Sequence, residues 1–222
     1  MNFDTQYMMS LYPLLISAID TTLYIAIVSL VFTVILGAVI SVIRFFKVKI
    51  LHQILGVYIS FFRATPILAQ LFFLSFGIPQ VIPVFKNITP ITATIITLSL
   101  NMSAYMAENF RAALESVDEG QFEACYSLGM NKIQAMIRII IPQAIKSSIP
   151  SIGNNFIMLI KSSSLGFTVG VIDILAQAKI ASATTFKFFE AYFAVMMMYW
   201  VLVIIFEQIQ KKFENKICYR YE

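Results

Sequence analysis

Side chains that could carry out catalysis or hold a metal ion are scarce in this chain. Its 222 residues include one histidine, His52, and two cysteines, Cys125 and Cys218. A metal centre or a histidine-based triad needs several such groups together, and the sequence offers no such set. No glycine opens a G-x-x-x-x-G-K-[ST] loop, so the chain has no such cradle for nucleotide phosphates. We expect no catalytic residue, no metal site and no cofactor in this chain, and we expect His52 to be a solvated loop side chain.

The most unusual polar stretch begins at Ser116 and reads SVDEGQFEACYSLGMNKIQAMIRIIIP. Asp118 followed by Gln121 is typical of a helix N-cap with a reciprocating partner, and Gly129 is typical of the residue just after a helix. These signals predict a short helix over 119–128.

The same stretch carries a second set of helix signals. Asn131 and Gln134 repeat the capping pattern, and Pro142 is expected to close or kink the helix that follows. The stretch therefore predicts two short helices at a sharp angle.

The first of these helices is predicted to be amphipathic. Phe122, Cys125, Tyr126 and Gly129 share one face, whereas Glu119 and Glu123 point elsewhere. One interpretation is a helix lying on lipid headgroups. Such helices usually carry basic residues on the polar face, and this one carries acids, which favours a docking element for a soluble partner.

The spacing of Glu123, Ala124, Cys125, Gly129 and the Ile-x-Ile-Pro ending at Pro142 resembles the EAA loop of permease subunits of ATP-binding-cassette importers. The family pattern is E-A-A, three residues, Gly, nine residues, Ile, one residue, Leu, Pro. Cysteine replaces the second alanine and isoleucine replaces the leucine. The stretches FFRATPILAQLFF, AYMAENFRAALESVDEGQFEA and LIKSSSL resemble the polar-amino-acid subfamily, so the likeness covers most of the chain from Thr22 to Phe206.

This resemblance implies a role for the short helix. In the family it enters a groove on a cytoplasmic ATPase subunit and passes the motion of that subunit to the spans. Ala124 and Gly129 would allow close approach, Glu123 would make polar contacts, and Phe122 and Tyr126 would anchor the helix on the ATPase or on its own bundle. With Glu119, these residues form the expected ATPase-coupling set within a coupling loop over 111–146.

Several polar residues fall within apolar stretches, where they usually face a bundle interior or a cavity. Arg63 could meet a substrate carboxylate, or it could brace the bundle by pairing with Glu108 or with helix-end carbonyls. Lys161 could line the pathway or extend its ammonium toward the interface. The expected substrate-pathway set is Arg63, Thr65, Gln70, Asn101, Ser103, Asn155, Lys161, Ser162 and Ser163.

The elements that would position these residues are membrane spans. The chain is 59% hydrophobic and only 13% charged, which excludes an ordinary soluble domain. Apolar blocks long enough to cross a bilayer cover residues 22–43, 54–76, 91–108, 149–167 and 188–209. Residues 12–20 fit either an interfacial helix or a longer first span. The sequence predicts one domain over 1–222, an all-α integral membrane protein with five transmembrane helices, which the resemblance makes a type I (MetI-like) importer permease with a cytoplasmic coupling-helix loop. Thr65 and Pro66 are expected to kink the second span.

The distribution of lysine and arginine predicts the orientation, because basic loops stay on the cytoplasmic side. One set of loops carries Arg44, Lys47, Lys49, Arg111, Lys132, Arg138, Lys146, Lys211, Lys212, Lys216 and Arg220, and the other carries Lys86, Lys179 and Lys187. The first set is expected to be cytoplasmic, which places the N-terminus outside and the C-terminus inside. Both cysteines then lie where thiols stay reduced. The net charge of +4 is explained by this bias and requires no nucleic-acid partner.

The expected function is that of a permease subunit, in a bacterial cytoplasmic membrane, of an importer for a polar amino acid. Cystine or a related sulfur-containing amino acid is the favoured substrate, and Ser162, where many related permeases have an acid, disfavours a cationic one. The resemblance implies an ATPase subunit that uses ATP, an extracytoplasmic amino-acid-binding protein, and a second permease copy or a similar permease. The alternatives are a transporter or channel driven by an ion gradient, which would favour paired intramembrane acids, and a membrane-embedded enzyme.

Overall fold

Helices and the turns that join them make up residues 3–218, which are the residues that this computed structural model describes. In chain order the helices are α1 (Thr5–Ile16), α2 (Ile19–Phe45), α3 (Leu51–Ala64), α4 (Ile67–Phe72), η1 (Phe73–Gly77), α5 (Ile78–Val81), η2 (Pro83–Asn87), α6 (Pro90–Glu115), α7 (Glu119–Ser127), α8 (Lys132–Ala135), η3 (Met136–Ile140), α9 (Ile141–Ser162), η4 (Ser163–Val169), α10 (Ile174–Thr185) and α11 (Phe188–Cys218). Arg220 and the side chain of Cys218, which enter the orientation and thiol predictions, lie outside the described part.

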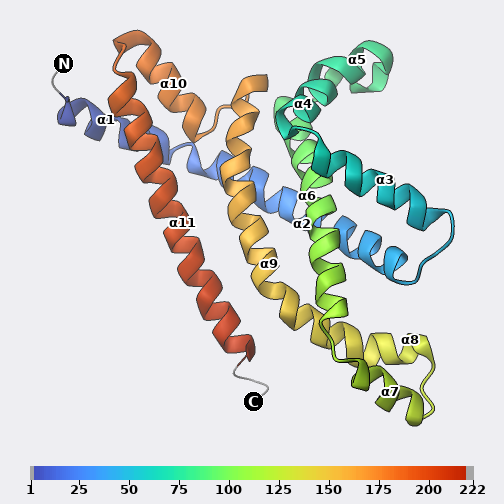
Figure 1. The fold of residues 1–222 in the computed structure, drawn as a ribbon. Coiled ribbons are helices and arrows are strands. Elements are labelled where there is room, and N and C mark those ends of the chain that lie inside the picture. The colour runs from blue at the N-terminus through green and yellow to red at the C-terminus, as the bar shows by residue number, and fades with distance from the viewer. Residues whose placement is uncertain (1–2, 219–222) are drawn as a thin grey trace.

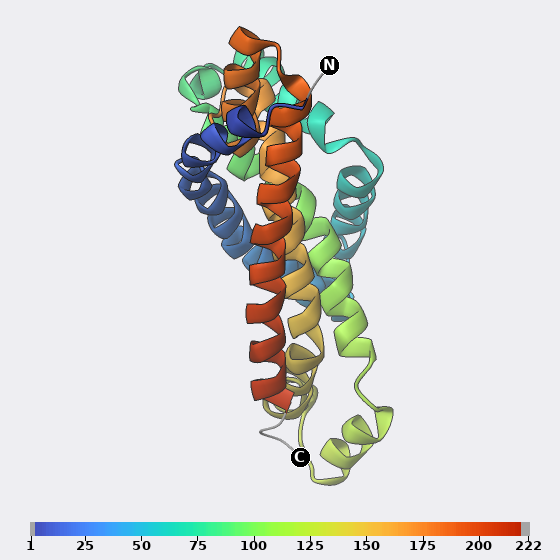
Figure 2. The same ribbon diagram turned by 90° about the vertical axis from the view of Figure 1, so that its left-hand side faces the viewer.

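The molecule has two distinct ends. Figure 1 shows α1, α5 and α10 at one end and α7 and α8 at the other, with α2, α6, α9 and α11 running between them. Figure 2 shows the same separation from the side. We call these the α10 end and the α7 end.

Two of the predicted spans are single long helices. Within residues 3–218, the helices long and apolar enough to cross a membrane alone are Ile19–Phe45 and Phe188–Lys216. These helices contain the first and fifth predicted spans. Residues 12–20 are divided, because α1 ends at Ile16 and α2 begins at Ile19.

The other predicted spans are less regular. The second predicted span, over 54–76, is sharply bent: α3 meets the following helical segment at 106°, and the break falls at Thr65 and Pro66, as the proline predicted. The fourth predicted span, over 149–167, lies in the helical segment Lys132–Val169, which meets α10 at 48° and forms the second bent pair. Up to two broken pairs and two single helices therefore qualify as spans, and α6, which contains 91–108, is too polar to qualify by composition. A count of five spans stays a prediction.

Close packing of α6 explains why a polar helix can lie in the middle of the bundle. Ala104 and Met106 are fully buried, and most of its small hydroxyl side chains are buried as well. Gly37 on α2 lets the helices approach, because a Cβ atom there would lie 2.8 Å from the side chain of Met106. Small residues allow such contacts between membrane helices, so α2 and α6 form a tightly packed centre of the fold.

The apolar core is divided between the two ends. The main cluster joins α1, α2, α6, α10 and α11 with the end of α9. A separate cluster at the α7 end consists of Ala113, Leu114, Met136, Ile140 and Ala144, with Phe45, Phe46, Val117, Phe122, Ile139 and Ile141 packed against them. We call this second group the junction cluster.

Candidate functional site

A short helix, α7, projects from one end of the molecule as the sequence predicted (Figure 1). Asp118 caps it by accepting a hydrogen bond from the Gly120 N–H at 2.7 Å. Gly129 follows the helix with φ of +76°, a left-handed conformation that glycine adopts without steric cost. The predicted reciprocating partner was wrong, because the Gln121 side chain instead accepts a hydrogen bond from Gln143 at 3.2 Å.

The helix after α7 does not end at Pro142, so of the two outcomes expected at this proline, closing the helix was wrong. Asn131 and Gln134 form the predicted capping box at its start, and the chain then stays helical through α8, η3 and α9. The turn over Met136–Ile140 is a π-helix. Such a wider turn accommodates Pro142, which has no N–H and would clash with a carbonyl one turn earlier in a regular helix.

The two faces of α7 have different surroundings. Phe122 packs against the junction cluster and Cys125 is 4% exposed, so this face is attached to the protein's own bundle. Of the two positions considered for Phe122, the structure therefore selects the bundle. The exposed residues of this segment include Glu119, Glu123, Ala124, Tyr126, Leu128 and Gly129. Tyr126 and Gly129, which were predicted to share the face of Phe122 and Cys125, are therefore not buried with them.

Leu128 is the exposed residue that sequence reasoning missed. Its side chain is 82% exposed at the end of α7, and Tyr126 beside it is 48% exposed. A leucine directly before the helix-ending glycine was the available signal. Leu128 and Tyr126 together expose apolar surface at the tip of α7.

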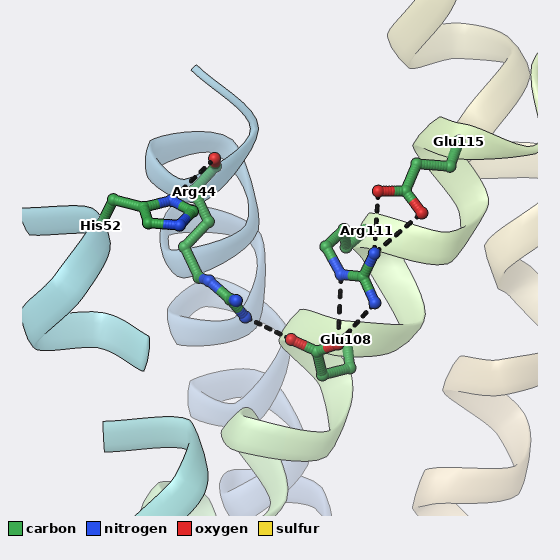
Figure 3. A network of polar contacts seen from close by, with 5 residues as sticks. All are labelled: Arg44, His52, Glu108, Arg111 and Glu115. Carbon is green, nitrogen blue, oxygen red and sulfur yellow. Dashed lines mark hydrogen bonds and ion pairs between the residues drawn. The ribbon is translucent and has the colours of Figure 1, made fainter. Parts of the chain in front are cut away.

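A chain of ion pairs lies at the junction of α2 and α6 (Figure 3). Glu108 pairs with Arg44 of α2 and, at 2.8 Å, with Arg111, which in turn pairs with Glu115 at 2.8 Å. The Glu108, Arg111 and Glu115 spacing of three and four residues on one helix was a signal for this network. His52 is not simply solvated, because its Nδ1 lies 3.2 Å from the carbonyl oxygen of Arg44.

Glu108, one of the partners considered for Arg63, is instead paired with Arg44 and Arg111. Arg63 is exposed, and its guanidinium carbon lies 5.4 Å from the centre of the Tyr105 ring. The Tyr105 hydroxyl donates to the Arg63 carbonyl at 3.4 Å. Arg63 thus stacks on α6 with its charge accessible.

Three of the predicted pathway residues meet at the break between α3 and α4. The Asn101 amide donates to the Phe62 carbonyl at 2.8 Å and to Gln70 at 3.1 Å. The Gln70 amide donates to the Thr65 hydroxyl at 2.7 Å and to the Thr65 carbonyl at 3.2 Å. These bonds satisfy carbonyls that the break removes from the helix. A cavity of about 470 Å³ adjoins the break, with Thr65 and Gln70 in its otherwise largely apolar lining.

The remaining predicted pathway residues do not join this group. The Ser103 hydroxyl contacts Tyr58 at 2.7 Å. Asn155 is buried and donates within α9 to the Ser151 carbonyl at 2.8 Å. The other three follow one another at the end of α9, where Lys161 is exposed, Ser162 is half-buried and Ser163 is buried. No hydrogen bond found within residues 3–218 joins these α9 residues to the break.

Two polar contacts near the α10 end were not predicted from the sequence. Asp173 is fully buried, caps α10 by accepting from the Ala176 N–H at 2.9 Å, and accepts from the Tyr199 hydroxyl at 3.4 Å. Asp4 caps α1 and pairs with Lys187 at 2.5 Å. These contacts attach α1 and α10 to α11. Among the described residues, no cluster of three or more His, Cys, Asp or Glu could hold a metal ion.

Comparison with known proteins identifies the kind of protein that has this arrangement. Residues 29–218 match the family described as the binding-protein-dependent transport system inner membrane component. The chain belongs to this family. It is 48% identical over 218 residues to the probable amino-acid permease protein YxeN of Bacillus subtilis strain 168, a match that covers 98% of this chain and 97% of the relative.

Two further relatives extend the comparison. The L-cystine transport system permease protein TcyL of Bacillus subtilis strain 168 is 35% identical over 219 residues, covering 97% of this chain and 92% of the relative. A solved structure described as an amino acid ABC transporter with histidines aligns at a TM-score of 0.90 with 35% identity, covering 97% of this chain and all of that one.

The chain is therefore a multi-pass permease of an amino-acid ABC importer, with a type I importer fold in an inner membrane. Permeases of this family are not enzymes themselves. The extent of the match, rather than any single contact, excludes the membrane-embedded enzyme and counts against the transporter driven by an ion gradient.

Proposed function

We propose that this chain forms the membrane pathway of an importer for a polar amino acid and that a separate ATPase subunit drives it by docking on α7. The observation that carries the proposal is the division of α7 into an attached face and an exposed face. Phe122 and Cys125 fix the helix to the bundle, and Glu123, Ala124, Tyr126 and Leu128 are left accessible. A helix held in this way can transmit force from a partner to the spans.

The partner uses ATP in this proposal, and this chain does not. ATP binding and hydrolysis would shift the pathway between outward-open and inward-open states through contacts that differ between the two states. The α7 end is cytoplasmic and the N-terminus is outside, as the lysine and arginine distribution predicts. An extracytoplasmic amino-acid-binding protein would deliver the substrate at the α10 end.

A second permease copy, or a similar permease, would complete the pathway. Within residues 3–218, no hydrogen bond that we find joins the groups at the α3–α4 break to the polar end of α9, and a second copy would supply the rest of the pathway. Arg63 and Lys161 remain accessible in this chain. In the assembled transporter we assign them to the pathway together with Thr65, Gln70, Asn101, Ser103, Asn155, Ser162 and Ser163.

Cystine or a related sulfur-containing amino acid is the proposed substrate. The support is the 35% identity to a permease named for L-cystine transport and the absence of an acid at Ser162. The test measures how strongly an excess of each unlabelled amino acid inhibits the uptake of labelled cystine. Stronger inhibition by glutamine or arginine than by unlabelled cystine would refute this choice.

Site-specific cross-linking tests the docking role. Leu128→Cys, assembled with the ATPase subunit, should give a cross-linked permease–ATPase product with a short cysteine reagent. Ile209→Cys, at an exposed position of α11, is the matched control and should give none. Equal labelling of both positions, or capture of lipid alone at position 128, would contradict the proposal.

A further inference from the structure

A lysine at the start of α8 connects the coupling loop to α2. The Lys132 ammonium lies 5.2 Å from the centre of the Phe46 ring and 5.9 Å from the centre of the Phe45 ring. The two rings pack edge to face at 5.8 Å. An ammonium near an aromatic face is attracted by the ring quadrupole, so Lys132 has a preferred position over the end of α2.

The same two rings belong to the junction cluster, which gathers the ends of α2, α6 and α9. The docking helix α7 joins this cluster through Phe122 and also contacts α8 and η3. Helix α2 reaches the cluster through Phe45 and Phe46, its last helical residue and the residue after it. Movement of α7 therefore reaches α2 at these rings, where Lys132 lies.

An open apolar groove lies beside the junction cluster. Its volume is about 140 Å³, and its lining joins Leu114 of the cluster to Ala38 of α2 and Ile145 of α9. Side chains that border an open groove have no packing partner on that side. The contact of Lys132 with the two rings therefore helps to fix the position of the α2 end.

The two rings are also connected to α6, so a displacement of the rings would reach that helix. Arg44 precedes Phe45 and pairs with Glu108 of α6 (Figure 3). The end of α2 is therefore attached to α8 through Lys132 and to α6 through Arg44. A pull on α8 would move the ends of α2 and α6 together.

We propose that Lys132 is a positioning residue that ties movement of the docking helix to α2. The role rests on the proposed function, because it presumes that an ATPase moves α7. Lys132 does not contact the ATPase in this proposal. It acts through Phe45 and Phe46.

The test uses the full transporter in lipid vesicles and measures amino-acid uptake and ATP hydrolysis in the same preparation. Lys132→Met keeps the chain length and removes the charge, and Lys132→Arg keeps a cation that can contact the rings. Lys49→Met is the control, because Lys49 is exposed and makes no ion pair or ring contact that we find within residues 3–218. We expect Lys132→Met to lower uptake per ATP hydrolysed roughly three-fold or more, and the other two variants to stay near the parent. A ratio for Lys132→Met equal to that for Lys49→Met would overturn the proposal.

A double variant separates a specific contact from general damage to the loop. If Lys132 acts through the rings, Phe46→Leu should lower the same ratio, and adding Lys132→Met to it should cause little further loss. Fully additive losses would refute action through Phe46.

The Leu128→Cys cross-link distinguishes failure of this inference from failure of the proposed function. Lys132→Met should leave the cross-link to the ATPase intact, because docking and transmission are different steps. Loss of the cross-link in Lys132→Met would show that the lysine supports docking and would overturn its role in transmission. Absence of the cross-link in the otherwise unchanged protein would refute the proposed function itself.

Discussion

Several single residues stabilise this fold by supplying a backbone conformation, a hydrogen bond or a charge that a neighbouring residue requires. Gly129 supplies a left-handed turn, Asn101 and Gln70 supply donors to the carbonyls of a broken helix, and Asp4 and Lys187 supply opposite charges between distant segments. Replacing any of these residues removes its local interaction or strains the backbone. Two of these roles lead to direct tests.

Replacing Gly129 with valine tests the left-handed turn. No atom lies within 4 Å of a Cβ added there, so crowding would not oppose the change. A β-branched residue at φ of +76° costs about 1–3 kcal/mol of backbone strain. We expect normal membrane insertion but at least several-fold lower uptake per ATP hydrolysed, measured in vesicles. Gly56→Val, at a helical position with no atom within 4 Å of the added Cβ, is a control for bulk, and unaltered coupling in Gly129→Val would count against the docking role.

Replacing Asp4 with asparagine tests the ion pair between α1 and the start of α11. A hydrogen bond from Lys187 is the main cause that lowers the pKa of Asp4 below its ordinary value of 3.8. A lowered folded-state pKa stabilises the fold above the ordinary value, and this contribution is lost as the pH falls through the folded-state pKa. The melting temperature in detergent should therefore be higher for the parent than for Asp4→Asn at pH 7, and the difference should shrink toward pH 3.

The exposed Asp20 provides the comparison for this experiment. Asp20→Asn removes a carboxylate that makes no ion pair that we find among the described residues, so its melting difference from the parent should be small at both pH values. An Asp4→Asn difference that is the same at pH 7 and pH 3 would show that the ion pair contributes nothing to stability.

At the scale of elements, the fold combines rigid and interrupted helices. Helices α2 and α6 are continuous and tightly packed, whereas the α3–α4 pair breaks and α9 begins with a π-turn before Pro142. The α3–α4 break persists because the amide of Asn101 on α6 donates to the freed Phe62 carbonyl. The continuous pair is joined at the α7 end by the ion pairs of Glu108.

Replacing Glu108 with glutamine tests this joint between α2 and α6. The side chain is 20% exposed, so the pairs are partly shielded from water and should count for more than surface pairs. We expect a loss of about 1–3 kcal/mol in unfolding free energy, measured by denaturant titration in detergent. The matched control is Glu115→Gln, which removes the exposed end of the network and should cost less than about 0.5 kcal/mol. Equal losses would show that the α2 contact adds nothing.

At the scale of the whole molecule, we propose that the protein forms half of a pathway that a second permease completes. Arg63 and Lys161, the two charged residues of the proposed substrate pathway, are both basic and exposed, and Glu108 of the third predicted span is paired with Arg44 and Arg111. In the proposed dimer such a pathway would favour zwitterionic or anionic amino acids over cationic ones.

Replacing Ser162 with aspartate tests that preference. An acid beside Lys161 would reduce the positive potential of the proposed pathway, so arginine and lysine should compete for uptake several-fold better than in the parent. The measurement is inhibition of labelled substrate uptake by unlabelled amino acids. Ser164→Asp, two residues further on, controls for a general effect of charge, and unchanged competition in Ser162→Asp would remove this residue from the pathway.

The sequence alone determined the features that depend on local chemistry. Hydropathy and capping residues placed the long helices, the α7 helix and its glycine turn, and the spacing around Glu123 indicated the family, because these signals act within a few residues. Proline also predicted the break at Thr65. The sequence pattern could not show that a π-turn before Pro142 would let the helix continue past this proline, because the formation of that turn depends on how α9 packs.

Only the tertiary structure decided which polar groups meet. Arg44 rather than Arg63 reached Glu108, Phe122 turned toward its own bundle, and Lys132 came to lie over Phe45 and Phe46. Partners of this kind are tens of residues apart, and several candidates have the same charge or size. The choice among them depends on the approach of whole helices, which Gly37 and the small residues of α6 permit and which no local pattern encodes.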